Sequence, residues 1–108
     1  MINITFNPTQ LKLDIRGHAG QDIEGKDIVC SATSMLYYTL AQSLNKSEEM
    51  LKRPCTIKIN NGNGYVRCYP KKEYKANISL MYWTILNGIE LLAEEYPQYI
   101  KFIVETQK

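Results

Sequence analysis

The segment LKLDIRGHAGQDIEGKDIVCSATSMLYYTLAQSL, residues 11–44, changes from the two-residue repeat of a strand to the longer repeat of a helix. Alternating apolar and polar residues predict a strand with one buried face, and apolar residues spaced by about one helical turn predict an amphipathic helix from about residue 28 to residue 44. The apolar positions are Leu11, Leu13 and Ile15 in the strand and Val29, Leu36, Leu40 and Leu44 in the helix, with Ala32 and Met35 beside them. A glycine-containing loop joins the two elements.

The rest of the sequence predicts further strands and a second helix, which ends before Pro97. Two of the strands flank Asn61-Gly62-Asn63-Gly64, whose Asn-Gly pairs favour the positive φ angles of a tight hairpin turn. Gly88 lies inside the second helix, where we expect another element to approach closely. The apolar positions are Ile2, Ile4 and Phe6, then Cys55, Ile57 and Ile59, then Val66 and Cys68, and last Ile100, Phe102 and Val104 in the strands, with Ile78, Met81, Ile85, Ile89, Leu92 and Tyr96 in the helix.

The predicted order of elements is ββ-α-ββ-α-β, without an internal repeat. Two helices packed on one face of a largely antiparallel sheet would bury every apolar stripe, so we predict an α+β fold. A length of 108 residues with 44% hydrophobic residues suits a single domain over residues 1–108.

Composition limits the classes of function, whereas the net charge is uninformative. The net charge of +2 is too small to indicate a polyanionic partner by itself. No apolar run reaches the roughly 20 residues that span a bilayer, and the first residues lack the basic-then-apolar order of a secretion signal, so we expect a soluble, cytoplasmic protein with no membrane partner. Cys30, Cys55 and Cys68 show no Cys-x-x-Cys spacing, which favours reduced thiols over a disulfide framework or a metal site, and no cofactor is indicated.

His18 and Cys30 are the candidate catalytic residues. A cysteine reacts as its thiolate, and a nearby imidazole or a helix N-terminus lowers the pKa of its thiol. Asp27 is a suitable N-cap, which would place Cys30 in the first turn of the helix, on the flank of its apolar stripe, with Ser34 one turn further on the same side. A buried structural thiol is the alternative interpretation of Cys30. The presence of Asp27 and of the single histidine, His18, favours the catalytic one.

Three parts of the sequence, Arg16-Gly17-His18-Ala19, Gly25-Lys26-Asp27-Ile28-Val29-Cys30 and Ser34, together resemble the signature of the ribosomal-processing cysteine protease family, Prp. The resemblance implies an endopeptidase that removes a short N-terminal extension from a bacterial large-subunit ribosomal protein. It assigns the nucleophile to Cys30 and its partner to His18, with Gly17, Asp27 and Ser34 in supporting roles. It also implies a two-layer α+β fold and a homodimer.

The segment between the two candidate residues has glycines at both ends, Gly20 and Gly25, a layout suited to a loop that moves aside for an extended peptide substrate. We expect backbone amides near Gly17 or Cys30 to receive the oxyanion that forms during peptide cleavage. Tyr37 and Tyr38 are candidates for the walls of a substrate pocket.

Two alternatives concern the partner of the protein. Ser31 and Thr33 stand where the family is rich in alanine, and the family also resembles processing enzymes found among phage structural genes, so a phage capsid or scaffold protein is an alternative substrate. A non-catalytic module that binds RNA or the ribosome is the other alternative, because aromatic and basic residues alternate in the segment from Gly62 to Tyr69, which is followed by Lys71, Lys72 and Lys75. Since this segment matches the RNP1 pattern poorly, we favour a solvated strand face and expect no nucleic-acid partner.

Overall fold

The computed structural model describes residues 1–17, 26–60 and 63–105. The strands are β1 (Ile2–Asn7), β2 (Lys12–Arg16), β3 (Thr56–Asn60), β4 (Asn63–Arg67) and β5 (Ile100–Val104). The helices are α1 (Lys26–Asn45) and α2 (Lys75–Glu95), and the short 3-10 helices η1 (Glu48–Met50) and η2 (Lys72–Tyr74) lie in the connections that lead to β3 and α2. The order ββ-α-ββ-α-β predicted from the sequence is confirmed.

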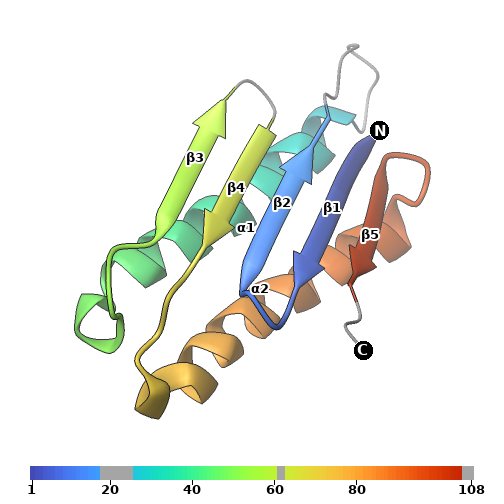
Figure 1. The fold of residues 1–108 in the computed structure, drawn as a ribbon. Helices are drawn as coiled ribbons and strands as arrows, with labels where there is room; N and C mark the ends of the chain where they lie inside the picture. The colour runs from blue at the N-terminus through green and yellow to red at the C-terminus, as the bar shows by residue number, and fades with distance from the viewer. Residues whose placement is uncertain (18–25, 61–62, 106–108) are drawn as a thin grey trace.

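The five strands form one sheet in the order β3-β4-β2-β1-β5 (Figure 1). The pairings of β1 with β2, β2 with β4 and β3 with β4 are antiparallel, whereas β5 pairs with β1 in parallel. Ile4 pairs with Ile15 on one side and with Phe102 on the other, and all three side chains belong to the core or pack against it. The sheet is therefore largely antiparallel, as predicted, with one apolar face.

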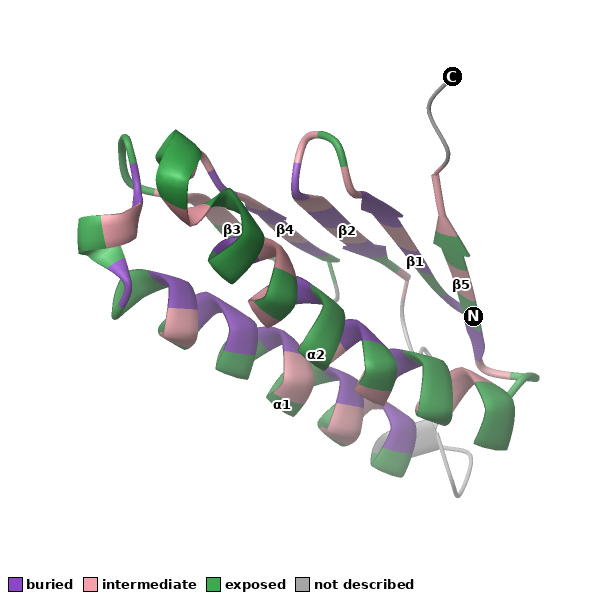
Figure 2. Ribbon diagram, turned by 90° about the horizontal axis from the view of Figure 1, so that it is seen from below, coloured by how far each residue is buried: buried purple, intermediate pink, exposed green. Residues whose placement is uncertain are grey.

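Both helices lie on that apolar face, and none of the described residues forms a layer over the other face of the sheet (Figures 1 and 2). The helices run side by side in opposite directions. Gly88 of α2 permits their close approach, because a Cβ built at this position would lie 2.8 Å from Cδ2 of Leu36 on α1. The structure thus confirms the predicted α+β arrangement and the close approach expected at Gly88.

The buried side of each helix differs in part from the sequence prediction. Met35, which was expected to widen the apolar stripe of α1, is 67% exposed, whereas Thr33 and Tyr37 are buried. In α2, Tyr82 and Leu86 are buried although the predicted stripe omitted them. Each helix packs against both the sheet and the other helix. Its buried side therefore differs from the stripe that was predicted from the spacing of apolar residues.

Tyr37 anchors α1 to strands β3 and β4. Its hydroxyl lies 3.1 Å from the carbonyl oxygen of Lys58, to which it donates, and accepts a hydrogen bond of 3.2 Å from the backbone N–H of Tyr65. Its ring rests on Gly64, where a Cβ would lie 2.9 Å from the ring carbon Cζ. Burial raises the pKa of Tyr37 above its ordinary value, so the hydroxyl stays protonated. Tyr37 is therefore a core residue, and not the pocket wall that the sequence suggested, whereas Tyr38 is exposed.

Replacing Tyr37 with phenylalanine would keep the ring and remove the hydroxyl. We expect the free energy of unfolding to fall by about 1–3 kcal/mol, because the carbonyl of Lys58 and the amide of Tyr65 lose a buried partner. Urea unfolding followed by circular dichroism measures this change. The matched control, Tyr38→Phe, should change the free energy of unfolding by less than about 0.5 kcal/mol. Equal losses in the two variants would contradict the anchoring role.

Candidate active site

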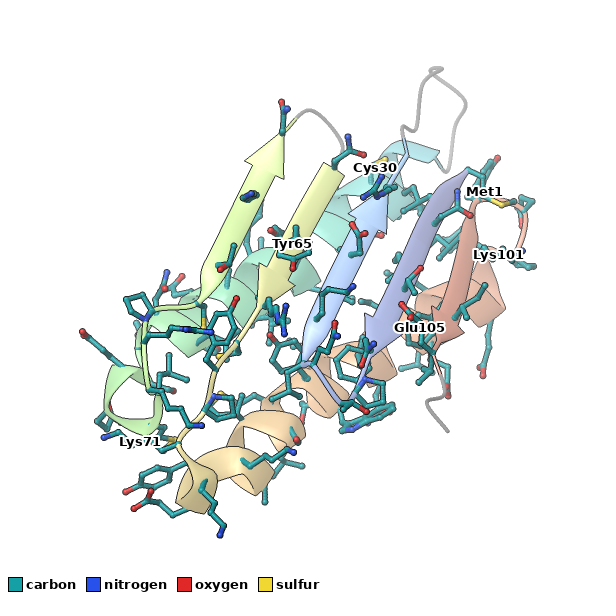
Figure 3. The ribbon with its side chains drawn as sticks, viewed as in Figure 1. Met1, Cys30, Tyr65, Lys71, Lys101 and Glu105 are labelled. Atoms are coloured by element: carbon teal, nitrogen blue, oxygen red, sulfur yellow. The ribbon has the colours of Figure 1, made fainter. Side chains whose placement is uncertain are left out.

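Cys30 lies near the start of α1, at the end of the sheet where β2 finishes (Figure 3). Its side chain is half-buried and packs in part against the core. Tyr37, two turns further along α1, is tied to the sheet, so the rigid helix fixes the position of Cys30 as well. A thiol that is fixed by its helix and only partly covered can react with a substrate that approaches from solvent.

The N-cap role expected for Asp27 is wrong, because α1 begins at Lys26. Asp27 is the second residue of the helix, and Cys30 is the fifth, at the start of the second turn and not in the first. The apolar pattern did not reveal this earlier start, since Lys26 and Asp27 are polar and carry no periodic signal. Cys30 thus lies beyond the first turn, where the helix dipole mainly acts.

His18, Gly20 and Gly25 lie outside the described residues. The pairing of His18 with Cys30, and the loop expected between the two glycines, therefore remain predictions. The structure does describe Gly17, the residue immediately before His18 in the sequence.

Gly17 adopts a backbone conformation that favours glycine. Its φ is +117°, and a Cβ at this position would overlap the carbonyl oxygen of Met1. Its amide N–H donates a hydrogen bond of 3.3 Å to Oδ1 of Asn63, the first residue of β4. Contacts with β1 and β4 thus fix the path of the chain as it leaves β2, which gives a structural reason for a glycine before residue 18.

The amides of Gly17 and Cys30 themselves are both engaged, whereas the expectation that backbone amides near these residues receive the oxyanion stays a prediction. Gly17 donates to Asn63, and Cys30 follows four helical residues, which places its amide among those that bond within the helix. Asn63 is a candidate that the sequence analysis missed, because that analysis assigned it only to a turn. Since its Oδ1 accepts from Gly17, its side-chain NH₂ group offers a donor near the end of β2. No sequence signal shows that β4 pairs with β2.

Ser34 is exposed one turn after Cys30, in agreement with its expected place on the same side of α1. Its neighbour Thr33 is 4% exposed, and its hydroxyl has no hydrogen-bond partner among the described residues. Thr39, in contrast, donates to the carbonyl of Met35. An unsatisfied hydroxyl costs stability, so the buried site at Thr33 suits the alanine that the family resemblance led us to expect near this position.

The other two cysteines form a close pair at the end of the β3–β4 hairpin opposite its turn. Their sulfur atoms are 2.7 Å apart. Cys68 is buried and Cys55 half-buried, and both pack in the core, as predicted. The hydrogen bond from the thiol of Cys68 lowers the pKa of Cys55 and raises the pKa of Cys68 itself. This pair is therefore a second thiol site, on a different part of the sheet from Cys30.

Other kinds of site find little support. Within residues 1–17, 26–60 and 63–105, no group of three or more His, Cys, Asp or Glu residues could hold a metal ion. No helix in this part of the chain is long and apolar enough to cross a bilayer. A groove between α1 and α2 is lined from Thr39 to Met50 on one side and from Asn77 to Ile85 on the other, so it lies more than two turns along α1 from Cys30. We therefore place the candidate site at Cys30.

The two-layer fold and the half-buried cysteine suit a small thiol enzyme. A family model described as cysteine protease Prp matches residues 1–101. The chain therefore belongs to the Prp family of cysteine proteases, which are peptide hydrolases, and the resemblance noted in the sequence is confirmed. No curated protein sequence matches the chain significantly.

Solved structures share the whole fold. An essential ribosomal processing protease Prp from Staphylococcus aureus, in complex with a covalently linked product peptide, is 19% identical with a TM-score of 0.77, and the match covers 97% of this chain and 100% of that one. The same kind of protease with a substrate peptide is 20% identical with a TM-score of 0.71, covering 96% and 97%. A protein from Streptococcus mutans is 25% identical with a TM-score of 0.70, covering 98% and 93%.

The pairing of Cys55 with Cys68 can be tested by alkylation with iodoacetamide as a function of pH. We expect Cys55 to be half-maximally reactive at a lower pH than an ordinary thiol, because the Cys68 thiol stabilises its thiolate. Cys68→Ala removes that donor and should move the Cys55 profile to higher pH, as measured by mass spectrometry of the modified peptides. Cys68→Ser keeps a hydroxyl donor and should move it less. Identical profiles in all three proteins would show that the hydrogen bond does not form in solution.

Proposed function

We propose that the protein is a cysteine endopeptidase that removes a short N-terminal extension from a bacterial large-subunit ribosomal protein, with Cys30 as nucleophile and His18 as acid and base. The main support is the half-buried thiol of Cys30, which belongs to the family's motif. This thiol lies at the end of the sheet where β2 finishes, and Gly17 and His18 follow β2 in the sequence. The relative from Staphylococcus aureus is a ribosomal processing protease, which supports the substrate class. Its covalently linked product peptide supports covalent chemistry.

In the first half of the proposed reaction, the Cys30 thiolate attacks the carbonyl carbon of the scissile peptide bond and forms a tetrahedral oxyanion. The oxyanion collapses, the carbon–nitrogen bond breaks, and protonated His18 transfers its proton to the departing amine. The mature protein leaves with a new N-terminus, and the extension stays attached to Cys30 as a thioester.

In the second half, neutral His18 takes a proton from a water molecule, whose oxygen attacks the thioester carbon. The carbon–sulfur bond breaks and the extension leaves with a new carboxylate. Cys30 returns to the thiolate and His18 to the protonated imidazole, so the cycle consumes one water for each peptide bond cleaved.

The remaining roles in this proposal fall to neighbouring residues. The side-chain NH₂ group of Asn63 is a donor to the oxyanion, together with backbone amides near Gly17 or Cys30. Gly17 sets the direction of the chain before His18, and Asp27 and Ser34 support the start of α1. The loop bounded by Gly20 and Gly25 opens to admit the extended substrate. Because the substrate is a ribosomal protein, we infer that the reaction takes place in the cytoplasm.

Cys30→Ser and His18→Ala test the assignment directly. Each should lower the rate of cleavage of a ribosomal protein precursor by at least about a thousandfold, because either change removes one member of a catalytic pair. Mass spectrometry of the products gives both the rate and the cleaved bond. Ser31→Ala, at the exposed neighbouring position, is the matched control and should cleave like the unaltered protein.

The same assay separates the alternatives. Full cleavage by Cys30→Ser would refute the nucleophile. Cleavage of a phage capsid or scaffold precursor, but not of the ribosomal precursor, would refute the proposed substrate and leave the chemistry in place.

We also infer that the protein forms a homodimer, which the family resemblance implies, and that the helical layer is its interface. Met35 of α1 and Leu80 and Leu91 of α2 are each 67% exposed. Large apolar side chains exposed on a helical surface are typical of interfaces between proteins.

Leu80→Glu would place a charge on this helical surface. We expect sedimentation velocity to show a dimer for the unaltered protein and a shift towards monomer for the variant, because burial of an unpaired carboxylate is unfavourable. Ile103→Glu, on the opposite face of the sheet and also exposed, is the matched control and should remain dimeric. A monomer before any substitution would rule out the dimer, and equal effects of the two substitutions would rule out this interface.

A further inference from the structure

Both helices lie on one face of the sheet (Figures 1 and 2), and the strands carry several basic residues on the other face. Strand residues that alternate with the core positions point to this face. The basic ones are Lys12 and Arg16 on β2, Lys58 on β3, Arg67 on β4 and Lys101 on β5, and the acidic ones are Asp14 and, directly after β5, Glu105. The whole chain has 13 basic and 11 acidic residues, so this excess of basic residues is a property of the face and not of the composition.

Most of this positive charge is not neutralised within the described part of the protein. Lys12 and Arg67 are directly opposite each other on β2 and β4, and like charges in such cross-strand pairs destabilise a sheet. The Nε atom of Arg16 lies 3.2 Å from Oδ2 of Asp14. Among the described residues, no other cation of this face has a carboxylate oxygen within 4.0 Å. An anionic partner on this face would relieve the repulsion between Lys12 and Arg67.

Two tyrosines lie among these cations. Tyr69 already stacks on arginine, since the guanidinium carbon of Arg53 is 3.9 Å from its ring centre and that of Arg67 is 5.3 Å away. Tyr65 lies between Lys58 and Asp14 in the strand register, and no aromatic or cationic group of the described residues stacks on its ring. Figure 3 shows Tyr65 on β4, near the middle of the sheet. Its ring is therefore open to stacking within the described part of the protein, with Lys58 on one side and Asp14 on the other.

We propose that this uncovered face binds single-stranded RNA, with bases stacked on Tyr65 and phosphates near Lys12, Lys58 and Arg67. Single strands present both unstacked bases and phosphates, which an aromatic ring and flanking cations on a flat sheet can contact together. An acidic protein segment would use the cations but not the ring. The choice of RNA over DNA rests on the proposed function, because a precursor that is a ribosomal protein assembles with ribosomal RNA. The binding itself does not require cleavage.

Fluorescence anisotropy with a labelled single-stranded RNA of about 12 nucleotides, a length within the site sizes of sheet-based binders, tests the proposal. The double variant Lys12→Glu/Lys58→Glu should weaken binding by roughly tenfold or more at low salt and reduce the dependence of affinity on salt concentration. The control is Lys46→Glu/Lys75→Glu, which has the same net charge but places the substitutions just after α1 and at the start of α2. Its affinity for RNA should lie within about threefold of that of the unaltered protein. If the first double variant is unfolded by circular dichroism, Lys12→Gln/Lys58→Gln replaces it with a smaller expected loss.

The ring is tested separately. Tyr65→Ala should weaken RNA binding by roughly tenfold, whereas Tyr65→Phe, which keeps a stacking surface, should bind normally. Neither should change the affinity for a poly-glutamate peptide. Cys30→Ser should bind RNA like the unaltered protein, so a failure of the cleavage assay and a failure of RNA binding remain distinguishable.

Four results would overturn the proposal. The first is an equal loss of RNA affinity in the two double variants, and the second is no RNA binding at low salt. The third is tighter binding of poly-glutamate, or of DNA of the same sequence, than of RNA. The fourth is a change from dimer to monomer in Lys12→Glu/Lys58→Glu. The last of these would assign the face to a second copy of the chain.

Discussion

The hydrogen bonds between the Tyr37 hydroxyl and the backbone of β3 and β4 set the position and the rotation of α1 on the sheet. They depend on Gly64, since any side chain there would push the ring of Tyr37 away. A helix rises about 1.5 Å per residue, so the Cα of Cys30, seven residues earlier, lies about 10 Å from the Cα of Tyr37 along the axis of α1. The contacts of Tyr37 therefore fix the position of Cys30 as well. The Cys30 thiol is thus held in place by packing that lies outside the candidate site.

The candidate site itself depends on which strands are neighbours. Gly17 and Asn63 are 46 residues apart in the sequence, and they meet because β2 pairs with β4. This pairing places the chain that leaves β2, the first residue of β4 and the start of α1 near the same end of the sheet (Figure 3). The strand pairing thus brings together groups from elements that are far apart in the sequence.

The sequence predicted the fold class and the order of the elements because alternating and helical apolar patterns are unambiguous in most of the chain. The signature around Cys30 predicted the family, since its spacing depends on local chain geometry. Two kinds of feature could not be predicted. The burial of Tyr37 and Tyr82 was missed because tyrosine suits either a surface or a core, depending on its neighbours. The contact of Asn63 with Gly17 was missed because strand pairing depends on the whole topology.

The helix start shows a third limit. Asp27 fits the usual preference for a capping residue, but the helix includes it together with Lys26. Local propensity is a weak guide to the boundary of a helix, and a shift of one or two residues there changes which amides are free. For a thiol near a helix start, such a shift alters how strongly the helix itself can stabilise negative charge.

The parallel pairing of β5 with β1 joins the strands that are furthest apart along the described chain. Contacts between residues so distant in sequence form slowly, because a long loop must close first. Until β5 is in place, β1 is an edge strand whose unpaired N–H and C=O groups can join with another extended chain. During synthesis, therefore, β1 stays open to wrong partners until nearly the whole domain has been made.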